Sequence, residues 1–216
     1  MIIKESDYLT HVGVLGMHWH HRKEPTPKES ITIKTGTTLQ RLTLTKNEKN
    51  NSRHAYVSQT KNDNNKYLVE WGNRGYKIDL QVTHDIIIPL HKERVDAFIE
   101  SVSKSNINKV AKGIAGLKYK NDANKFLEEY ENRNAKAVSE ESYRSFSSSL
   151  VSSSYNRKIF FKELEKRGYN AIIDDNDSNW TDKPIIVFKR NKNIKQKSYT
   201  PINDKMIEEA IKNVKQ

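Results

Sequence analysis

Three residues in the first half of the chain carry groups that could bind a phosphate-bearing ligand. Arg41 ends the segment TTLQR, and its planar guanidinium is suited to bidentate binding of a phosphate. Ser58 and Thr60 lie two positions apart in YVSQT, so both hydroxyls would lie on one face of a strand. The alternative is that Arg41 is a solvated or salt-bridged base and that Ser58 and Thr60 are ordinary strand-surface residues.

Carboxylates gather in a short loop of the second half. Such groups could stabilise a positive charge that develops during a reaction. The acids of this loop are Asp174, Asp175, Asp177 and Asp182. A calcium loop is not expected, because NDSNWTDK lacks the spaced ligands, the glycine and the terminal glutamate of an EF-hand. A turn is the simpler interpretation.

Other familiar catalytic and metal-binding patterns are missing from the sequence. The histidines His11, His18, His20 and His21 have neither an HExxH motif nor paired Cys/His spacing, so no metal site is expected. The chain has no cysteine, which excludes disulfides and thiolate ligands. It has no Walker A loop and no G-x-S-x-G elbow, so nothing points to an NTPase or a hydrolase.

Apolar periodicity predicts the elements that would position these groups. Alternating residues predict two short strands in 31–45, around Thr35-Gly36, and further strands at 54–58, 76–82 and 85–89. An apolar stripe predicts a helix over 91–104 that packs on the sheet, and helices are expected within 112–154. A helix that ends at Gly168 should precede strands at 169–175 and 184–188.

This order of elements predicts an α+β domain. Two prolines in the charged stretch 23–30 indicate an extended tether, so residues 1–30 form a docking segment and tether. The α+β domain is expected over 31–196. An amphipathic helix, capped by Asn203-Asp204, is expected within 197–216 and would dock on the domain or on a second subunit.

The stretch YLTHVGVLGMHWHHRK, residues 8–23, indicates a recognition segment. Its glycines permit a compact turn that presents Val14, Leu15, Met17 and Trp19 to a partner. It resembles the H-x-G-x-x-G-M-x-W-G-x-R box of virion and head-morphogenesis proteins from phages of Gram-positive bacteria. The matching residues are His11, Gly13, Gly16, Met17, Trp19 and Arg22, whereas His20 stands where the box has glycine. The resemblance implies docking to other virion proteins, with Leu15, Met17 and Trp19 as the anchors.

Residues 31–196 resemble the ADP-ribosyltransferase-like domains of phage and polymorphic-toxin proteins. TTLQR and YVSQT are similar to the family's arginine strand and Ser-Thr-Ser strand, and RGYNAII followed by IIVF is similar to its ending. The resemblance implies NAD as cofactor, with Arg41 on the diphosphate and Ser58 and Thr60 on the nicotinamide half. The family carries a glutamate before the last strand, where this chain has Lys183-Pro184. Because a lysine opposes a developing cation, we expect the fold to be retained and the catalysis lost.

Charge and hydropathy restrict the partners and the location. The chain has 216 residues and a formal net charge of +11, which indicates contact with a polyanion or simply solubility. The bases are spread along the chain, so a DNA contact would be to the backbone and non-specific. No apolar run is long enough for a membrane span or a signal peptide.

Two functional hypotheses follow, together with a weaker third. The favoured one is a minor structural protein of a phage particle, internal or in the head near the portal, made in the host cytoplasm and present in one or several copies. It would bind other virion proteins, contact packaged DNA non-specifically and need no cofactor. The alternative is an active, NAD-dependent ADP-ribosyltransferase that modifies a host protein, using Arg41, Ser58 and an acid such as Asp174 or Asp175. A DNA-binding protein with no virion role is supported by charge alone.

Overall fold

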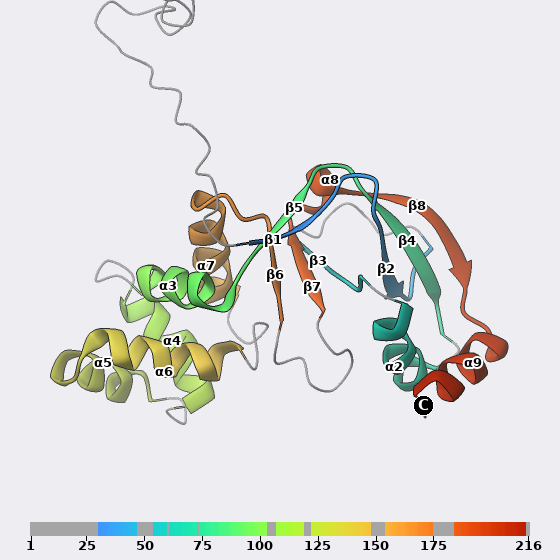
Figure 1. Cartoon of the computed structure of the whole chain (residues 1–216). Helices are drawn as coiled ribbons and strands as arrows, with labels where there is room; N and C mark the ends of the chain where they lie inside the picture. The colour runs from blue at the N-terminus through green and yellow to red at the C-terminus, as the bar shows by residue number, and fades with distance from the viewer. Residues whose placement is uncertain are drawn as a thin grey trace, which may run out of the picture.

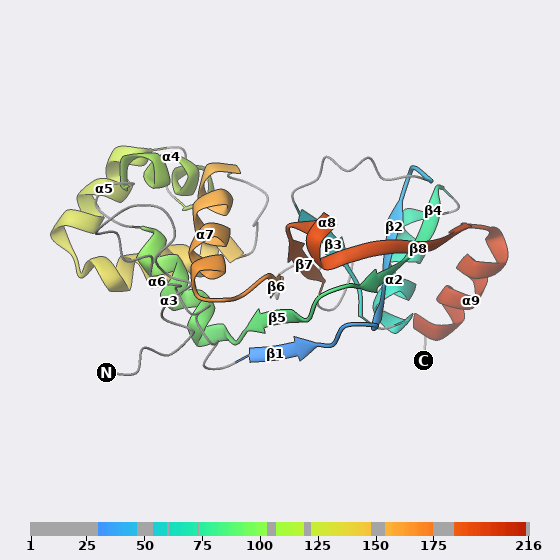
Figure 2. The ribbon, with the colours of Figure 1, turned by 90° about the horizontal axis from the view of Figure 1, so that it is seen from above.

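The structure is a computed structural model. It describes residues 30–46, 54–59, 61–72, 74–102, 107–118, 122–147, 154–174 and 184–214. The fold is α+β, as the sequence predicted: several small antiparallel sheets lie beside a group of helices, and Figures 1 and 2 show the two parts side by side. No helix in these described ranges is long and apolar enough to cross a bilayer.

A long antiparallel ribbon forms the first part of the fold. Strands β1 (Ser30–Ile33) and β2 (Thr38–Thr43) pair with β5 (Ile86–Pro89) and β4 (Tyr76–Val82), respectively. The β1–β5 pair and the β2–β4 pair keep one continuous register, since Ile33 lies opposite Ile86 and Thr38 lies opposite Gln81. The ribbon turns at Gly36, whose φ of 91° favours glycine and whose N–H donates to the Val82 carbonyl at 2.9 Å.

Two further strand groups complete the β part. Strands β3 (His54–Val57), β7 (Ile185–Phe188) and β6 (Ala171–Ile173) form a sheet in the order β3-β7-β6. Strand β8 (Ile194–Pro201) extends the other sheet to β2-β4-β8. The pairing of the two apolar strands β6 and β7, expected from the sequence, is confirmed.

Single residues join these sheets. Gln40 of β2 and Ser58, directly after β3, form an isolated antiparallel bridge. Asn170, directly before β6, donates its backbone N–H to the Ile87 carbonyl at 3.1 Å. Its side chain accepts from the Ile87 N–H at 2.6 Å and donates to the Asp85 carbonyl at 2.9 Å. These hydrogen bonds therefore link the β3-β7-β6 sheet to both of the other sheets around a shared core.

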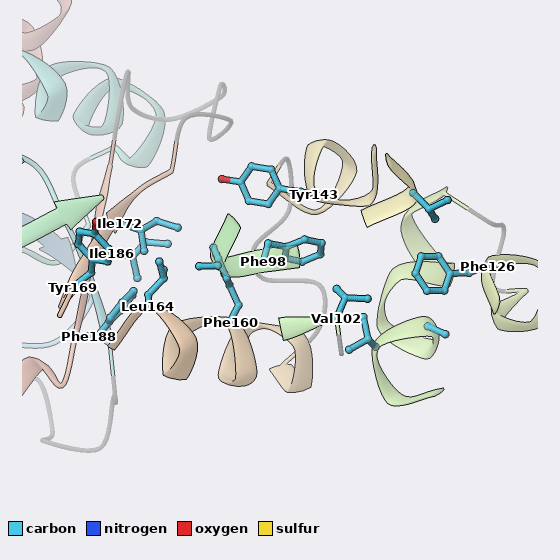
Figure 3. Packing of buried hydrophobic residues seen from close by; sticks show 14 residues of the cluster. Phe98, Val102, Phe126, Tyr143, Phe160, Leu164, Tyr169, Ile172, Ile186 and Phe188 are labelled. Atoms are coloured by element: carbon cyan, nitrogen blue, oxygen red, sulfur yellow. The ribbon is translucent and has the colours of Figure 1, made fainter. Parts of the chain in front are cut away.

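The β3-β7-β6 sheet is buried on both faces, and every residue of β7 is buried. One face contributes Ala55, Val57, Ala171, Ile185 and Val187 to the core that the sheet shares with the ribbon. The other face contributes Ile172, Ile186 and Phe188 to a second core, formed with the helices (Figure 3). A strand buried on both faces has a continuous apolar sequence, which explains IIVF.

Helices α3 to α7 supply the helical side of this second core. They are α3 (His91–Ser101), α4 (Ile107–Lys118), α5 (Ala123–Asn132), α6 (Ala135–Ser147) and α7 (Ser154–Lys166). Phe161 of α7 stacks on Phe188, with ring centroids 4.2 Å apart. The helix predicted over 91–104 exists as α3, but it packs mainly against α6 and α7, with only its start next to β5. Phe98 of α3 lies 5.8 Å from Phe160 of α7 (Figure 3).

The end of α7 matches the sequence prediction. Gly168 has a φ of 88°, and the Tyr169 N–H donates to the Leu164 carbonyl at 3.1 Å. The left-handed glycine and this hydrogen bond together terminate the helix.

The C-terminal helix is present as predicted, but the boundary before it differs from the prediction. Strand β8 crosses position 196, where the domain was expected to end, and it continues to Pro201 before α9 (Asp204–Val214) begins. Residues 198–201 pair with β4 and belong to the sheet, whereas the predicted helix cap at Asn203-Asp204 is confirmed: Asn203 Oδ1 accepts from the Met206 N–H at 3.1 Å. Helix α9 docks on α2 (Lys61–Trp71), which the sequence analysis did not predict. The apolar contact between them joins Leu42, Leu68, Ile202 and Ala210.

Candidate functional site

Arg41 lies in the middle of β2 and is half-buried. It is opposite Ile78, which is fully buried in the core between the ribbon and the β3-β7-β6 sheet. Directly opposite residues of an antiparallel pair project from the same face. The register therefore places Arg41 on the core-facing side of β2, between Leu39 and Thr43 in the same row.

Ser58 lies beside Arg41 along the backbone but on the other face. Its N–H donates to the Gln40 carbonyl at 2.8 Å, and the Gln40 N–H donates to the Ser58 carbonyl at 2.9 Å. Ser58 thus shares the face of Gln40, and successive residues of a strand alternate between faces. Arg41 and Ser58 were expected to act on one ligand, and the register does not bring them onto one face.

The predicted hydroxyl pair is only half described. Strand β3 ends at Val57, and Ser58 is 5% exposed. Thr60 lies outside the described residues, as do Asp175, Asp177, Asp182 and Lys183. The residues of the N-terminal box, from His11 to Arg22, also lie outside them.

Asp174 lies at the same end of the sheet as Ser58. Its N–H donates to the Pro184 carbonyl at 2.9 Å, and its side chain is buried, with the residue 6% exposed. Continuing the register past the Val57–Ile185 pair puts Ser58 opposite Pro184 from the other side. Ser58 and Asp174 therefore flank Pro184 on the helix-covered face, about 10 Å apart at two strand spacings.

A buried arginine that the sequence analysis missed lies next to this strand end. Arg94 of α3 is 4% exposed, and its Nη1 donates to the Ile173 carbonyl at 3.0 Å. Its Nη2 lies 3.5 Å from His91 Nδ1, and the His91 ring lies 6.0 Å from the ring of Tyr143. A guanidinium here provides positive charge beside the buried Asp174 and helps to fix α3 to β6. No sequence pattern marked Arg94, since arginines are seldom fully buried.

The pKa of His54, at the start of β3, is sensitive to the positive charge of Arg41. Burial lowers the pKa of its imidazole, and the positive charges of Arg157 and Arg41 lower it further. The ring makes edge contacts with Tyr56 and Phe161, each at 6.1 Å between centroids. A half-buried histidine of this kind is neutral at pH 7.

The predicted catalytic set therefore divides into two places. Arg41 lies on the core-facing side of β2, whereas Ser58 and Asp174 lie on the helix-facing side of the β3-β7-β6 sheet, and Arg94 reaches only the Asp174 end, at the Ile173 carbonyl. Among the described residues there is no group of three or more histidines or acids that could hold a metal ion. Comparison with protein-family models, curated proteins and solved structures found no match.

Proposed function

We propose that this chain is a minor structural protein of a bacteriophage particle, internal or in the head near the portal. It docks through its N-terminal box, in which His11, Gly13, Leu15, Gly16, Met17, Trp19 and Arg22 form the contact. The box supports the proposal because its large apolar side chains need a partner surface. Its distance from the domain along the chain, across a tether with two prolines, supports a separate docking role.

The observation that carries the non-catalytic part of the proposal is the burial of Ser58 and Asp174. They are 5% and 6% exposed, and Arg41 projects from the opposite face to Ser58. Transfer of ADP-ribose requires a cation, a hydroxyl and a carboxylate on one substrate at once. This separation supports the loss of the chemistry, while the ADP-ribosyltransferase-like framework is proposed from the sequence resemblance of residues 31–196.

Particle incorporation tests the docking role. We expect purified particles to contain the wild-type chain and to lose it when residues 1–23 are deleted or when Leu15, Met17 and Trp19 are all changed to Ala. The matched control changes His18 and His21 to Ala, which alters the same segment and leaves the box positions intact. Unchanged incorporation of the deletion variant would refute the docking role.

The alternative is an active, NAD-dependent ADP-ribosyltransferase that modifies a host protein. It is favoured by one observation: Ser58 and Asp174 flank Pro184 on the same face of one sheet. Its test is the release of nicotinamide from NAD by the purified full chain, compared with Asp174→Asn. If neither protein releases nicotinamide, the alternative is abandoned.

A further inference from the structure

Strand β8 forms an outer edge of the β2-β4-β8 sheet, on the side of the molecule away from α4, α5 and α6 (Figures 1 and 2). The sequence from 189 to 197, KRNKNIKQK, enters this strand with five bases and no acid. Lys189 pairs with Glu165 at 3.0 Å, and Arg190 is buried. The remaining three, Lys192, Lys195 and Lys197, are exposed.

Lys197 occupies a bulge of this edge strand. Asp79 lies opposite Ser198, and Leu80 lies opposite Gln196, so Lys197 is the extra residue between them. A bulge bends the strand and re-aims the side chain that it carries. Lys197 therefore leaves the regular ladder at the end of the basic run.

A fourth lysine, Lys46, joins the edge from the bend that follows β2. The Gln196 side chain donates to the Lys46 carbonyl at 3.2 Å, and Lys46 Nζ lies 4.4 Å from the centre of the Tyr199 ring. Tyr199 is 40% exposed and makes an edge contact with Tyr76 at 5.9 Å. The basic edge, defined as Lys46, Lys192, Lys195, Lys197 and Tyr199, thus runs along one strand edge, with Lys195 on the face of Gln81 and with Lys46 and Tyr199 on the face of Ile78.

Asp79, which lies opposite Ser198 next to the basic edge, already accepts hydrogen bonds. Asp79 of β4 accepts from the Gln40 side chain at 3.1 Å and from the Ser198 hydroxyl at 2.7 Å. Edge lysines and bulges also keep a sheet edge from pairing with another chain. That role accounts for Lys195 and Lys197, but it does not require Lys46 above an exposed tyrosine.

We propose that the basic edge binds the phosphate backbone of nucleic acid. Clustered lysines neutralise phosphates without reading sequence, and an exposed aromatic ring beside them can accept a base of a single strand. The inference rests on the proposed function only for the source of the nucleic acid, which would be the packaged genome. Binding by the purified chain does not depend on particle docking, so the two proposals fail in different experiments.

The test is fluorescence anisotropy of the full chain with a labelled duplex of about 20 base pairs, at salt concentrations from about 50 to 200 mM. We expect the variant Lys46→Gln/Lys195→Gln/Lys197→Gln to bind at least about tenfold more weakly at low salt. The slope of log K against log salt should shrink by about 2.7, or about 0.9 for each phosphate that the variant no longer neutralises. The control variant is Lys112→Gln/Lys125→Gln/Lys136→Gln, which removes the same charge from α4, α5 and α6.

The control variant should keep the wild-type slope. Equally weakened binding by both variants would mean that net charge and not the basic edge drives binding, and the proposal would be overturned. Absence of salt-dependent binding by the wild-type chain, or binding to anionic vesicles alone, would overturn it as well. A labelled single strand and Tyr199→Leu distinguish the two forms: weaker binding confined to the single strand identifies base contact, and unchanged binding to both identifies the duplex backbone.

Discussion

Gln40 and Ser58 exchange both of their backbone hydrogen bonds, at 2.9 and 2.8 Å, where β2 meets β3. This pair joins the ribbon to the β3-β7-β6 sheet and fixes the face on which each neighbour lies. Because Arg41 follows Gln40 directly, its side chain is held on the opposite face from Ser58. A change of rotamer cannot bring the two groups onto one face.

The close approach of β4 to the end of β2 requires glycine at position 75. Gly75 has a φ of 84°, and an added Cβ would overlap the Thr43 carbonyl oxygen and lie 2.9 Å from Leu44 Cα. We expect Gly75→Ala to lower the free energy of unfolding by more than about 3 kcal/mol, measured by urea titration.

Gly72→Ala is the matched control for that substitution. Gly72 has a φ of 75°, but nothing lies within 4 Å of an added Cβ. Its destabilisation should be limited to the backbone strain of about 1–2 kcal/mol. Equal destabilisation at positions 72 and 75 would show that the contact with Thr43 has no energetic weight.

Asn170 should be one of the most sensitive polar positions in the fold. Asn170→Ala leaves the Ile87 N–H and the Asp85 carbonyl without their side-chain partner. We expect the free energy of unfolding in urea to fall by about 2–4 kcal/mol, because each part-buried group then lacks compensation. Asn134→Ala, which removes the exposed cap of α6, should cost only about 1 kcal/mol. If the free energy of unfolding falls less for Asn170→Ala than for Asn134→Ala, the hydrogen bonds of Asn170 do not hold β5 and β6 together.

The stability of the fold should depend on pH through Asp85, which lies at the bend of the ribbon. The Thr35 N–H, the Lys34 ammonium and the Thr35 hydroxyl lower the pKa of its carboxyl from 3.8 to about 2. Since the folded pKa lies below the unfolded one, the stabilisation is present above about pH 4 and is lost as the pH falls toward 2. Melting temperatures from pH 5 to about pH 2 should fall more steeply for the wild type than for Asp85→Asn. If the melting temperatures of the two proteins fall in parallel with pH, the bonds of Asp85 to Lys34 and Thr35 do not stabilise the fold.

His54 gives a direct probe of the charge of Arg41. Its pKa is lowered by burial first, then by Arg157 and Arg41, so Arg41→Gln should raise it in an NMR titration of the ring. The lowered pKa also means that His54 destabilises the fold as the pH falls below 6.5, because the unfolded chain then binds the proton more tightly. Arg133→Gln, which alters an arginine paired with Glu129 and Glu141, should leave the titration unchanged. If the pKa of His54 is unaltered in Arg41→Gln, the charge of Arg41 does not act on the His54 ring.

Local patterns in the sequence predicted much of the fold. The apolar alternation of the ribbon, the continuous run of β7 and the glycine after α7 all express local rules, and they were confirmed. Strand β8 was missed because its burial ends at Ile194 and its identity comes from pairing with β4. Helix α2, with the polar sequence KNDNNKYLVEW, depends on the contact of Leu68 with α9.

The candidate site was less predictable than the fold. The types of Arg41, Ser58 and Asp174 were visible in the sequence, but the face that each one occupies depends on pairing between distant strands. Burial of Arg94 depends on the docking of α3 beside β6, which leaves no local pattern. Long-range register therefore decides whether such residues form one site.

Calorimetric titration of the purified full chain with NAD most directly tests the proposal that Arg41, Ser58 and Asp174 do not form a working NAD site. The same titration is made with Arg41→Ala, and circular dichroism verifies that both proteins are folded. We expect no saturable heat of binding in either protein. Saturable binding by the wild type that disappears in Arg41→Ala would contradict the proposal and would show that Arg41 belongs to a working NAD site.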